Sequence, residues 1–376
     1  MNSNLKRLKL KLSEFKHRFC YKYNYEKMAI AMKKYKNCPK EEKKEKYQIK
    51  REINLLKQYW GCYPTHYFRY ELYKKENNLT EEELKNYIPE FFFYNVFLPQ
   101  FEDKKYKFLI EEKNITDNYF KGLNISCPKV IAKKIKNEFF DENMNYISID
   151  NLLKKIEISD FNKIFFKPTD GEGGYGIDIF SKNAKSIYRK KDGKILDNDY
   201  LLSLSNDYII QPGLIQDKKI SEIYSNSINT FRIATENKNG RVRVLCATLR
   251  LGKAGSEVDN SAQGGIILGI NIENGNVKEY AVTELCEKYY NHPDSKYIFK
   301  GKKIEKWDTI KKFAIDSAKK IPYFSYLGWD IALLEDEVVA IETNLGFGID
   351  HYQIPLGGLR KQFNINKPEE FWESLR

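Results

Sequence analysis

A glycine-rich stretch is the first part of the sequence whose residue types and spacing could do chemistry. It reads FKPTDGEGGYGI over residues 166–177, so that Lys167 precedes four glycines within six residues. Glycines let backbone N–H groups approach phosphate oxygens closely, and the lysine adds a fixed positive charge. We therefore expect a phosphate-binding loop, with an ordinary glycine-rich surface turn as the alternative.

The surroundings of this loop exclude several nucleotide-binding folds. A dinucleotide-binding fold needs a helix after the glycines, whereas residues 175–180 have the pattern of a strand. A protein kinase needs a His-Arg-Asp catalytic loop, and none of the 4 histidines is followed by Arg-Asp. The pattern G-x-x-x-x-G-K-[ST] of a P-loop does not occur either. What remains is a β-hairpin flap over a phosphate, with Lys167 on its first strand.

Two carboxylates and an amide form the second candidate site. The acidic residues 335–337 separate two apolar β-runs and so predict a hairpin centred on Asp336. This register pairs Asp330 with Glu342, Ala332 with Ala340 and Leu334 with Val338, and it keeps Asn344 on the same face. Opposed carboxylates repel unless a cation lies between them, and oxygen ligands of this kind favour Mg²⁺. The alternative is that Asp330 begins a turn and Glu342 is exposed at a strand end.

The rest of the pattern predicts an α+β fold whose strands position these two sites. Strand-like runs occur at residues 163–167, 175–180, 208–211, 229–235, 242–251, 265–271, 327–334 and 338–343. Helices are expected at residues 307–320 and 103–113, and a hairpin turn at Asn274-Gly275. Because most strands follow one another without an intervening helix, we expect largely antiparallel sheets.

The positive charge of the chain is concentrated in one segment. The 376 residues carry a formal net charge of +12, but residues 1–75 hold 21 Lys and Arg against 7 Asp and Glu, and the remaining residues hold 43 against 45. Most of the chain is therefore nearly neutral and gives no direct reason to expect a nucleic-acid partner. The 41% of hydrophobic residues exclude a disordered protein.

Residues 1–100 are expected to form a basic, mostly helical module. Leu5, Leu8, Leu12, Phe15 and Phe19 recur at helical spacing with basic residues between them. Such a helix could pack on the protein itself, lie on an anionic membrane through residues 1–20, or bind nucleic acid, for which no recognition motif is present. Six scattered cysteines and the lack of a long apolar run indicate a cytoplasmic location, peripheral at the inner face of the cell membrane if the helix is an anchor.

Together these features resemble the ATP-grasp superfamily. Its specific parts are the flap after Lys167, the β-run into Gln211-Pro212-Gly213-Leu214, and the Asp330…Glu342-x-Asn344 set. The segments NTFRIAT (229–235), TLRLGKAG (248–255) and VDNSAQGGI (258–266) are similar, more narrowly, to the sugar-transfer-associated ATP-grasp group encoded with bacterial polysaccharide machinery. The resemblance covers residues 100–365. It implies an ATP-grasp catalytic domain at residues 101–376, with subdomains near 101–160, 161–215 and 216–376, in which two α+β subdomains clamp ATP.

The resemblance implies which residues would bind ATP. The phosphates would contact Lys167, a second lysine, Lys104, with Lys105 or Lys107 as alternatives, and the flap residues Thr169, Gly171, Glu172, Gly173, Gly174, Tyr175 and Gly176. The backbone of Gln211, Pro212, Gly213 and Leu214 would read the adenine edge, and Asp217 or Glu222 would hold the ribose.

The resemblance also implies a metal site and two catalytic arginines. Asp330, Glu342 and Asn344 would bind one or two Mg²⁺ ions. Arg232 and Arg250 would stabilise the transferred phosphoryl group or hold the acceptor carboxylate, unless each simply pairs with a surface acid. The loop at residues 252–265 is expected on the substrate side, or else is an ordinary long connection.

The implied activity is that of an ATP-dependent carboxylate–amine ligase working through an acyl phosphate in the synthesis or modification of capsule, O-antigen or exopolysaccharide. Its substrates would be small or lipid-linked sugar acids and amino acids, its cofactors ATP and Mg²⁺, and no nucleic acid is expected. One alternative is a phosphotransferase acting on a glycan-related acceptor, and another is a membrane-surface or nucleic-acid-binding protein with a non-catalytic ATP site. The scattered histidines give no reason to choose a general base.

Overall fold

The computed structural model describes residues 8–12, 25–102, 104–170, 176–183, 187–261 and 264–375. Residues 8–12 are helical; Leu8 and Leu12 are exposed, and Leu10 packs against the helical core. The other residues of the predicted segment 1–20, and with them most of the expected membrane contact, lie outside the described residues. None of the helices in the described part is long and apolar enough to cross a bilayer.

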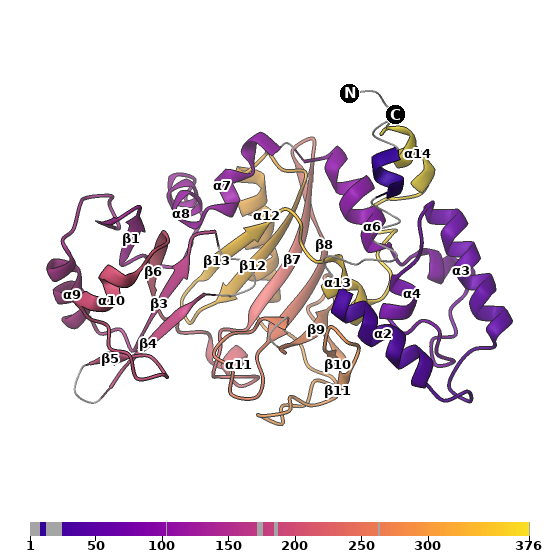
Figure 1. Cartoon of the computed structure of the whole chain (residues 1–376), viewed down its shortest axis with the longest axis horizontal. Coiled ribbons are helices and arrows are strands. Elements are labelled where there is room, and N and C mark those ends of the chain that lie inside the picture. The colour runs from indigo at the N-terminus through magenta and orange to yellow at the C-terminus, as the bar shows by residue number, and fades with distance from the viewer. Residues whose placement is uncertain are drawn as a thin grey trace.

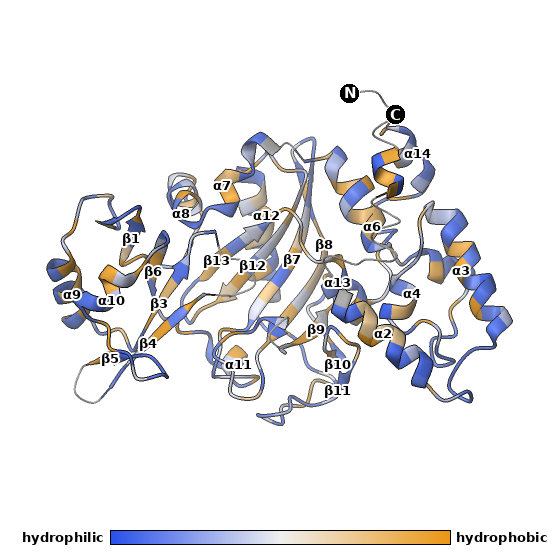
Figure 2. Cartoon of the chain, in the orientation of Figure 1, coloured by the Kyte–Doolittle hydropathy of each residue, from blue (hydrophilic) through white to orange (hydrophobic). Residues whose placement is uncertain are grey.

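A helical region precedes the sheets (Figure 1). It contains α2 (Tyr25–Asn37), α3 (Lys46–Trp60), α4 (His66–Arg69), α5 (Glu81–Lys85), α6 (Glu90–Phe92), the π-helical turn η1 (Phe93–Phe97) and the 3-10 turn η2 (Leu98–Gln100). Apolar residues at helical spacing bury one side of α3, where Leu56 and Trp60 lie in the core, and Gly61 ends the helix with a left-handed backbone. Figure 2 shows hydrophobic and hydrophilic segments alternating along α2 and α3.

The helical region shares its core with the C-terminal part of the chain. Phe93 packs on Phe347 with ring centroids 5.7 Å apart, and Phe97 packs on Tyr326 at 5.3 Å. The helices α13 (Ile349–Leu356) and α14 (Pro368–Glu373) contribute residues to the same apolar cluster. Because this core is continuous, residues of the helical region can take part in a site built mainly by later segments.

A broken helix leads into the first sheet. The structure has η3 (Lys104–Tyr106), α7 (Phe108–Glu111) and α8 (Lys113–Gly122) where the sequence predicts one helix over residues 103–113. This prediction is wrong because Glu112 has an extended backbone and its carboxylate accepts the N–H of Ile115 at 2.7 Å. Glu112 therefore caps a new helix, and Lys113 begins α8 instead of ending its predecessor.

The first sheet has six strands in the order β2-β1-β6-β3-β4-β5, and its neighbouring strands are antiparallel. They are β1 (Ala132–Ile135), β2 (Glu138–Asp141), β3 (Lys163–Pro168), β4 (Asp178–Lys182), β5 (Tyr188–Arg189) and β6 (Tyr208–Pro212). Apolar residues of α9 (Ile149–Glu157) and α10 (Asn198–Ser203) join its core. Pairing of Phe166 with Asp178 confirms the hairpin around the glycine-rich stretch, although β4 begins at residue 178 and not at 175.

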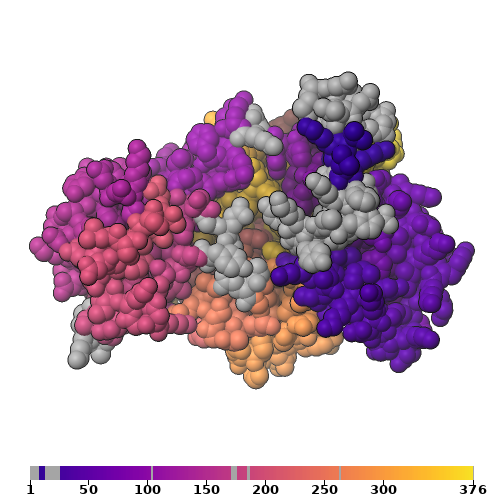
Figure 3. Space-filling view, in the orientation of Figure 1, coloured from indigo at the N-terminus to yellow at the C-terminus, as the bar shows by residue number. Residues whose placement is uncertain are grey.

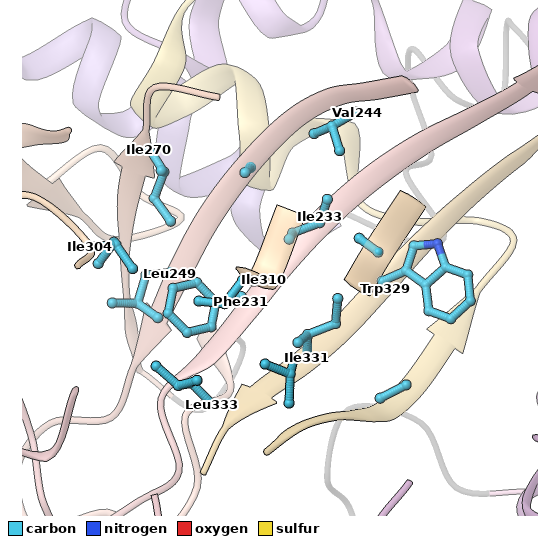
Figure 4. Close-up of a cluster of buried hydrophobic side chains, with 14 of the residues drawn as sticks. Phe231, Ile233, Val244, Leu249, Ile270, Ile304, Ile310, Trp329, Ile331 and Leu333 are labelled. Carbon is cyan, nitrogen blue, oxygen red and sulfur yellow. The ribbon is translucent and has the colours of Figure 1, made fainter. Parts of the chain in front are cut away.

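The second sheet has seven strands in the order β11-β10-β9-β8-β7-β12-β13, again antiparallel, which confirms the predicted sheet type. They are β7 (Thr230–Lys238), β8 (Arg241–Leu251), β9 (Ile266–Ile270), β10 (Val277–Val282), β11 (Lys288–Tyr289), β12 (Tyr326–Leu333) and β13 (Val338–Asn344), with α11 (Lys218–Ser221) before them. Helix α12 (Trp307–Lys320), as predicted, covers one face, where Phe231, Trp329 and Ile310 share a core (Figure 4). Alternation along the strands places Arg232 and Asp330 on the other face.

The β12–β13 hairpin has the predicted pairing at its far end but an irregular register. Asp330 lies opposite Glu342, whereas Ile331 lies opposite Ala340, so that Ile341 is the extra residue of a β-bulge. The predicted pairs Ala332–Ala340 and Leu334–Val338 are therefore wrong by one position. The bulge puts Ala340 into the core under α12 and leaves Glu342 on the same face as Asp330.

Candidate active site

A cleft of about 1700 Å³ lies between the two sheets. Strands β3 and β6 contribute one wall, β7, β8, β12 and β13 contribute the other, and residues of the helical region, among them Lys27 and Tyr94, line one end. In Figure 3, gold C-terminal segments are visible deep in a hollow beside the magenta lobe that contains the first sheet. The lining residues come from positions 27 to 351, so only the folded chain brings them together.

Asp330 and Glu342 face each other in this cleft, and Asn344 follows on β13. Burial and the charge of Asp330 raise the pKa of Glu342, because two adjacent carboxylates are unfavourable without enough positive charge. The buried Nδ2 of Asn344 has no hydrogen-bond partner among the described residues. An unpartnered buried polar atom of this kind is expected where a ligand completes a site.

These three side chains fit a hard divalent cation. They offer two carboxylates and an amide oxygen, the donor types that Mg²⁺ takes together with water and phosphate oxygens. In the part of the chain that the structure describes, no three His, Cys, Asp or Glu side chains are close enough to share a metal. A cation here would thus need the Asn344 amide and oxygens from water or substrate in addition to the two carboxylates.

Arg232 and Arg250 converge on Asp330. Arg232 lies beside Asp330 in the sheet and donates from Nε to Oδ1 at 2.8 Å and from Nη2 to Oδ2 at 2.7 Å. Nη2 of Arg250 is 3.4 Å from the same Oδ2, and its Nε is 3.4 Å from Asp259. Burial alone would raise the pKa of Asp330, but the two arginines outweigh it and lower that pKa. The acid that pairs with these arginines is thus a residue of the cleft and not a surface acid.

Lys167 lies on β3 in the wall opposite these carboxylates. Burial lowers the pKa of its ammonium to about 8. Beside it, Nζ of Lys113 donates to the Thr169 carbonyl at 3.4 Å, and Thr169 itself is buried. Gly176 has φ of +74°, and a Cβ there would come within 3.1 Å of Pro168. Gly171, Glu172, Gly173, Gly174 and Tyr175 lie outside the described residues.

Residues 93–366 match a family model described as sugar-transfer associated ATP-grasp. The chain belongs to this ATP-grasp family. No curated protein matches the chain significantly.

Several solved structures are similar to this ATP-grasp protein at low identity. The ATP-grasp ligase PsnB complexed with a minimal precursor is 12% identical, with a TM-score of 0.38, over 73% of this chain and 63% of that one. D-alanyl-alanine synthetase A from Vibrio cholerae is 11% identical, with a TM-score of 0.38, over 71% and 63%. The VanG D-Ala:D-Ser ligase from Enterococcus faecalis is 14% identical, with a TM-score of 0.40, over 70% and 61%. The chain thus spans less than two thirds of each of these proteins.

The end of β6 provides the wall expected to face adenine in an ATP-grasp protein. Gln211, Pro212 and Leu214 line the cleft. Gly213 does not line it, and its N–H donates to the Lys163 carbonyl at 2.8 Å, so this donor is not available to a base. This N–H group extends the β3–β6 ladder, and the expected contact of residues 211–214 with adenine stays a prediction.

The predicted ribose ligands are not in the cleft. Asp217 caps α11 and pairs with Lys306 at 2.8 Å, and Glu222 pairs with Lys219 at 3.1 Å. Glu257, which pairs with Lys163 at 2.6 Å, is one of several carboxylates that line the cleft. Glu257 lies in a loop without regular structure, and no local pattern distinguishes it from other surface acids. Sequence reasoning therefore missed it.

The predicted second phosphate lysine, Lys104, stays a prediction, because its side chain lies outside the described residues. Its backbone lies in η3. Lys105 lies over the ring of Tyr106, and Lys107 lines the cleft while pairing with Glu111 at 2.7 Å. Lys113, close to Lys167, was missed because its place at the start of α8 depends on the cap formed by Glu112.

Proposed function

We propose that this protein is an ATP-dependent carboxylate–amine ligase that forms an acyl phosphate during synthesis or modification of a bacterial surface polysaccharide. One observation supports this proposal most directly. Arg232 and Arg250 converge on Asp330, which lies opposite Glu342. Lys167 and Lys113 line the other side of the same cleft. Membership of a sugar-transfer associated ATP-grasp family supports the choice of ATP and of a sugar-related acceptor.

The first step of such a reaction brings two anions together. An oxygen of the substrate carboxylate forms a bond to the γ-phosphorus of ATP, and the bond from that phosphorus to the β-γ bridging oxygen breaks, which releases ADP. Lys167, Lys113 and the arginines would neutralise the repulsion and align the reactants. Mg²⁺ held by Asp330, Glu342 and Asn344 would supply additional positive charge next to the phosphates.

In the second step the nitrogen of an amine attacks the acyl carbon, phosphate leaves, and the amine proton passes to solvent or a base. No covalent enzyme intermediate is needed, and the cleft agrees with this. Burial raises the pKa of Cys127, a lining thiol, to about 12, so it remains protonated at neutral pH. The hydroxyl of Ser261 donates to Glu284 at 2.6 Å, and Ser261 is not among the residues that line the cleft.

A product analysis tests the proposal. We expect ADP and inorganic phosphate to appear in equal amounts when the protein, MgATP, a hexuronic acid and an amino acid are combined, with an amide detected by mass spectrometry. Screening further sugar acids and amines would identify the preferred pair. ADP accompanied by a phosphorylated acceptor would instead establish the phosphotransferase.

The depressed pKa of Lys167 predicts a proton change when ATP binds. Above pH 8 much of this lysine is neutral in the free protein, and phosphate oxygens favour its charged form. ATP affinity should therefore fall as the pH rises above about 8, and binding there should take up a proton. Titration calorimetry in two buffers of different ionisation enthalpy measures this uptake. Lys167→Met should abolish it, whereas Lys182→Met, on β4 outside the cleft lining, should leave it unchanged; uptake that persists in Lys167→Met would assign the proton to another group.

A further inference from the structure

His351 has both ring nitrogens in contact with charged side chains of the cleft. It lies in the first turn of α13, seven positions after Asn344. Its Nδ1 is 3.2 Å from Nη1 of Arg232, and its Nε2 is 2.9 Å from Oε1 of Glu284. These contacts join residues 119 and 67 positions apart. They place the imidazole between a guanidinium and a carboxylate.

The chemistry of the two partners determines the tautomer of His351. A guanidinium can only donate, so Nδ1 must present its lone pair to Arg232. An ionised carboxylate can only accept, so Nε2 must carry the proton that faces Glu284. Burial would raise the pKa of Glu284, but His351 and Lys27 lower it well below its usual value and keep it ionised. The two contacts therefore hold the ring in one orientation.

Glu284 is itself held from three sides. The Ser261 hydroxyl donates to it at 2.6 Å, His351 donates at 2.9 Å, and Lys27 of α2 forms an ion pair with it. The other charged groups that surround His351 are Asp350, Asp330, and the Arg69–Glu90 pair behind Asp350. A continuous series of contacts thus runs from the helical region through Glu284 and His351 to Arg232.

These contacts use part of the donor capacity of Arg232. A guanidinium has five N–H donors in a planar fork. Nε and Nη2 each use one N–H on Asp330, and Nη1 uses one on His351. With three N–H groups held from two directions, the plane of the fork is fixed. Two N–H groups have no partner among the described residues and can bind an anionic substrate group.

We propose that His351 is a positioning residue that, kept as its Nε2–H tautomer by Glu284, orients Arg232 toward the anion of the acceptor or the transferred phosphoryl group. This inference rests on the proposed function for the identity of the anion, but not for the orientation of the arginine. It also assigns a role to the helical region, since Lys27 secures Glu284 and thereby the histidine. Arg232 touches the reactants; His351 acts through it.

Three substitutions of His351 distinguish its contact with Arg232 from the effect of its side-chain volume. In His351→Asn the amide oxygen can take the place of Nδ1 and accept from Arg232, whereas in His351→Gln the amide nitrogen can take the place of Nε2 and donate to Glu284. Both variants remove the aromatic ring, and His351→Ala removes both contacts. We expect His351→Asn to retain most of the ADP release from MgATP, and Gln and Ala to lose about tenfold or more, as expected for a hydrogen bond to a charged group. The Michaelis constant for ATP should change little, because a misoriented Arg232 slows the chemical step and so lowers kcat.

A second measurement detects the contact between His351 and Arg232 without following the reaction. In protein labelled with ¹⁵N-histidine, the Nδ1 signal of His351, assigned by its disappearance in His351→Asn, should be that of a hydrogen-bonded acceptor and should move in Arg232→Met. The inference is overturned if Nδ1 is insensitive to Arg232→Met, or if the Gln variant is at least as active as the Asn variant. A negative ligase assay with a normal Nδ1 response would refute the proposed function and leave the positioning contact standing.

Discussion

Glu342→Gln should reduce ATP turnover by roughly 1000-fold, the size of effect that corresponds to several kcal/mol of lost metal-ion stabilisation. The carboxylate lies opposite Asp330 and offers the second anionic donor for a divalent cation, which a neutral amide replaces poorly. The measurement is ADP release from MgATP, followed over a range of Mg²⁺ concentrations. We expect the Mg²⁺ dependence to shift to higher concentration before turnover disappears.

The same variant should keep its stability or gain some. Burial and Asp330 already raise the pKa of Glu342, which means that the folded protein disfavours its charge at neutral pH. A neutral amide of the same shape removes that penalty, so the thermal midpoint should not fall. Glu335→Gln, at the exposed turn of the same hairpin, is the matched control and should leave turnover unchanged. Turnover above a tenth of the wild-type rate in Glu342→Gln would show that this residue is not a metal ligand.

Arg69→Met should lower the free energy of unfolding by about 3–5 kcal/mol, because it leaves buried carboxylates without their cation. Arg69 is buried on α4 and forms ion pairs with Glu90 and, at 3.0 Å, with Asp350. Burial would raise the pKa of Asp350, but His351 and Arg69 lower it to about 2, so this carboxylate is ionised in the folded protein. Chemical denaturation followed by tryptophan fluorescence measures the loss.

Two further variants show whether charge or volume causes this loss. Combining Arg69→Met with Glu90→Gln and Asp350→Asn removes the unpaired charges and should recover much of the stability. Lys85→Met breaks an exposed pair with Glu82 and should cost less than about 1 kcal/mol. If the triple variant is no more stable than Arg69→Met alone, lost packing and not unpaired charge is the cause.

Much of the fold follows from local patterns. The boundaries of α12 were predictable because polar and apolar residues recur at helical spacing over fourteen residues. The strands were predictable because their apolar residues are either continuous or alternate with polar ones. The β12–β13 register was predictable only at Asp330 and Glu342, because a β-bulge leaves no local signature in an apolar run. The break before α8 was missed for a similar reason: the Glu112 cap depends on one backbone conformation and not on composition.

The candidate site divides in the same way. Lys167, Asp330 and Glu342 could be proposed from type and spacing, and Arg232 from the family resemblance, since each lies on a strand that the sequence indicates. Lys113, Glu257 and His351 could not, because each lies at a helix start or in a loop where many similar residues occur. The residues next to His351 in the sequence give no indication that its side chain contacts Arg232.

The sequence by itself determined which chemical groups are available and how the nearest of them are paired: a lysine before glycines, two carboxylates facing across a hairpin, and arginines on neighbouring strands. The tertiary structure decided what those groups contact. It pairs Asp330 with Arg232 across 98 positions and Arg232 with His351 across 119, and it brings Lys27 to Glu284. Local rules act over a few residues of one strand or helix, whereas these contacts depend on the order of strands in the sheet and on the core that attaches the helical region to it.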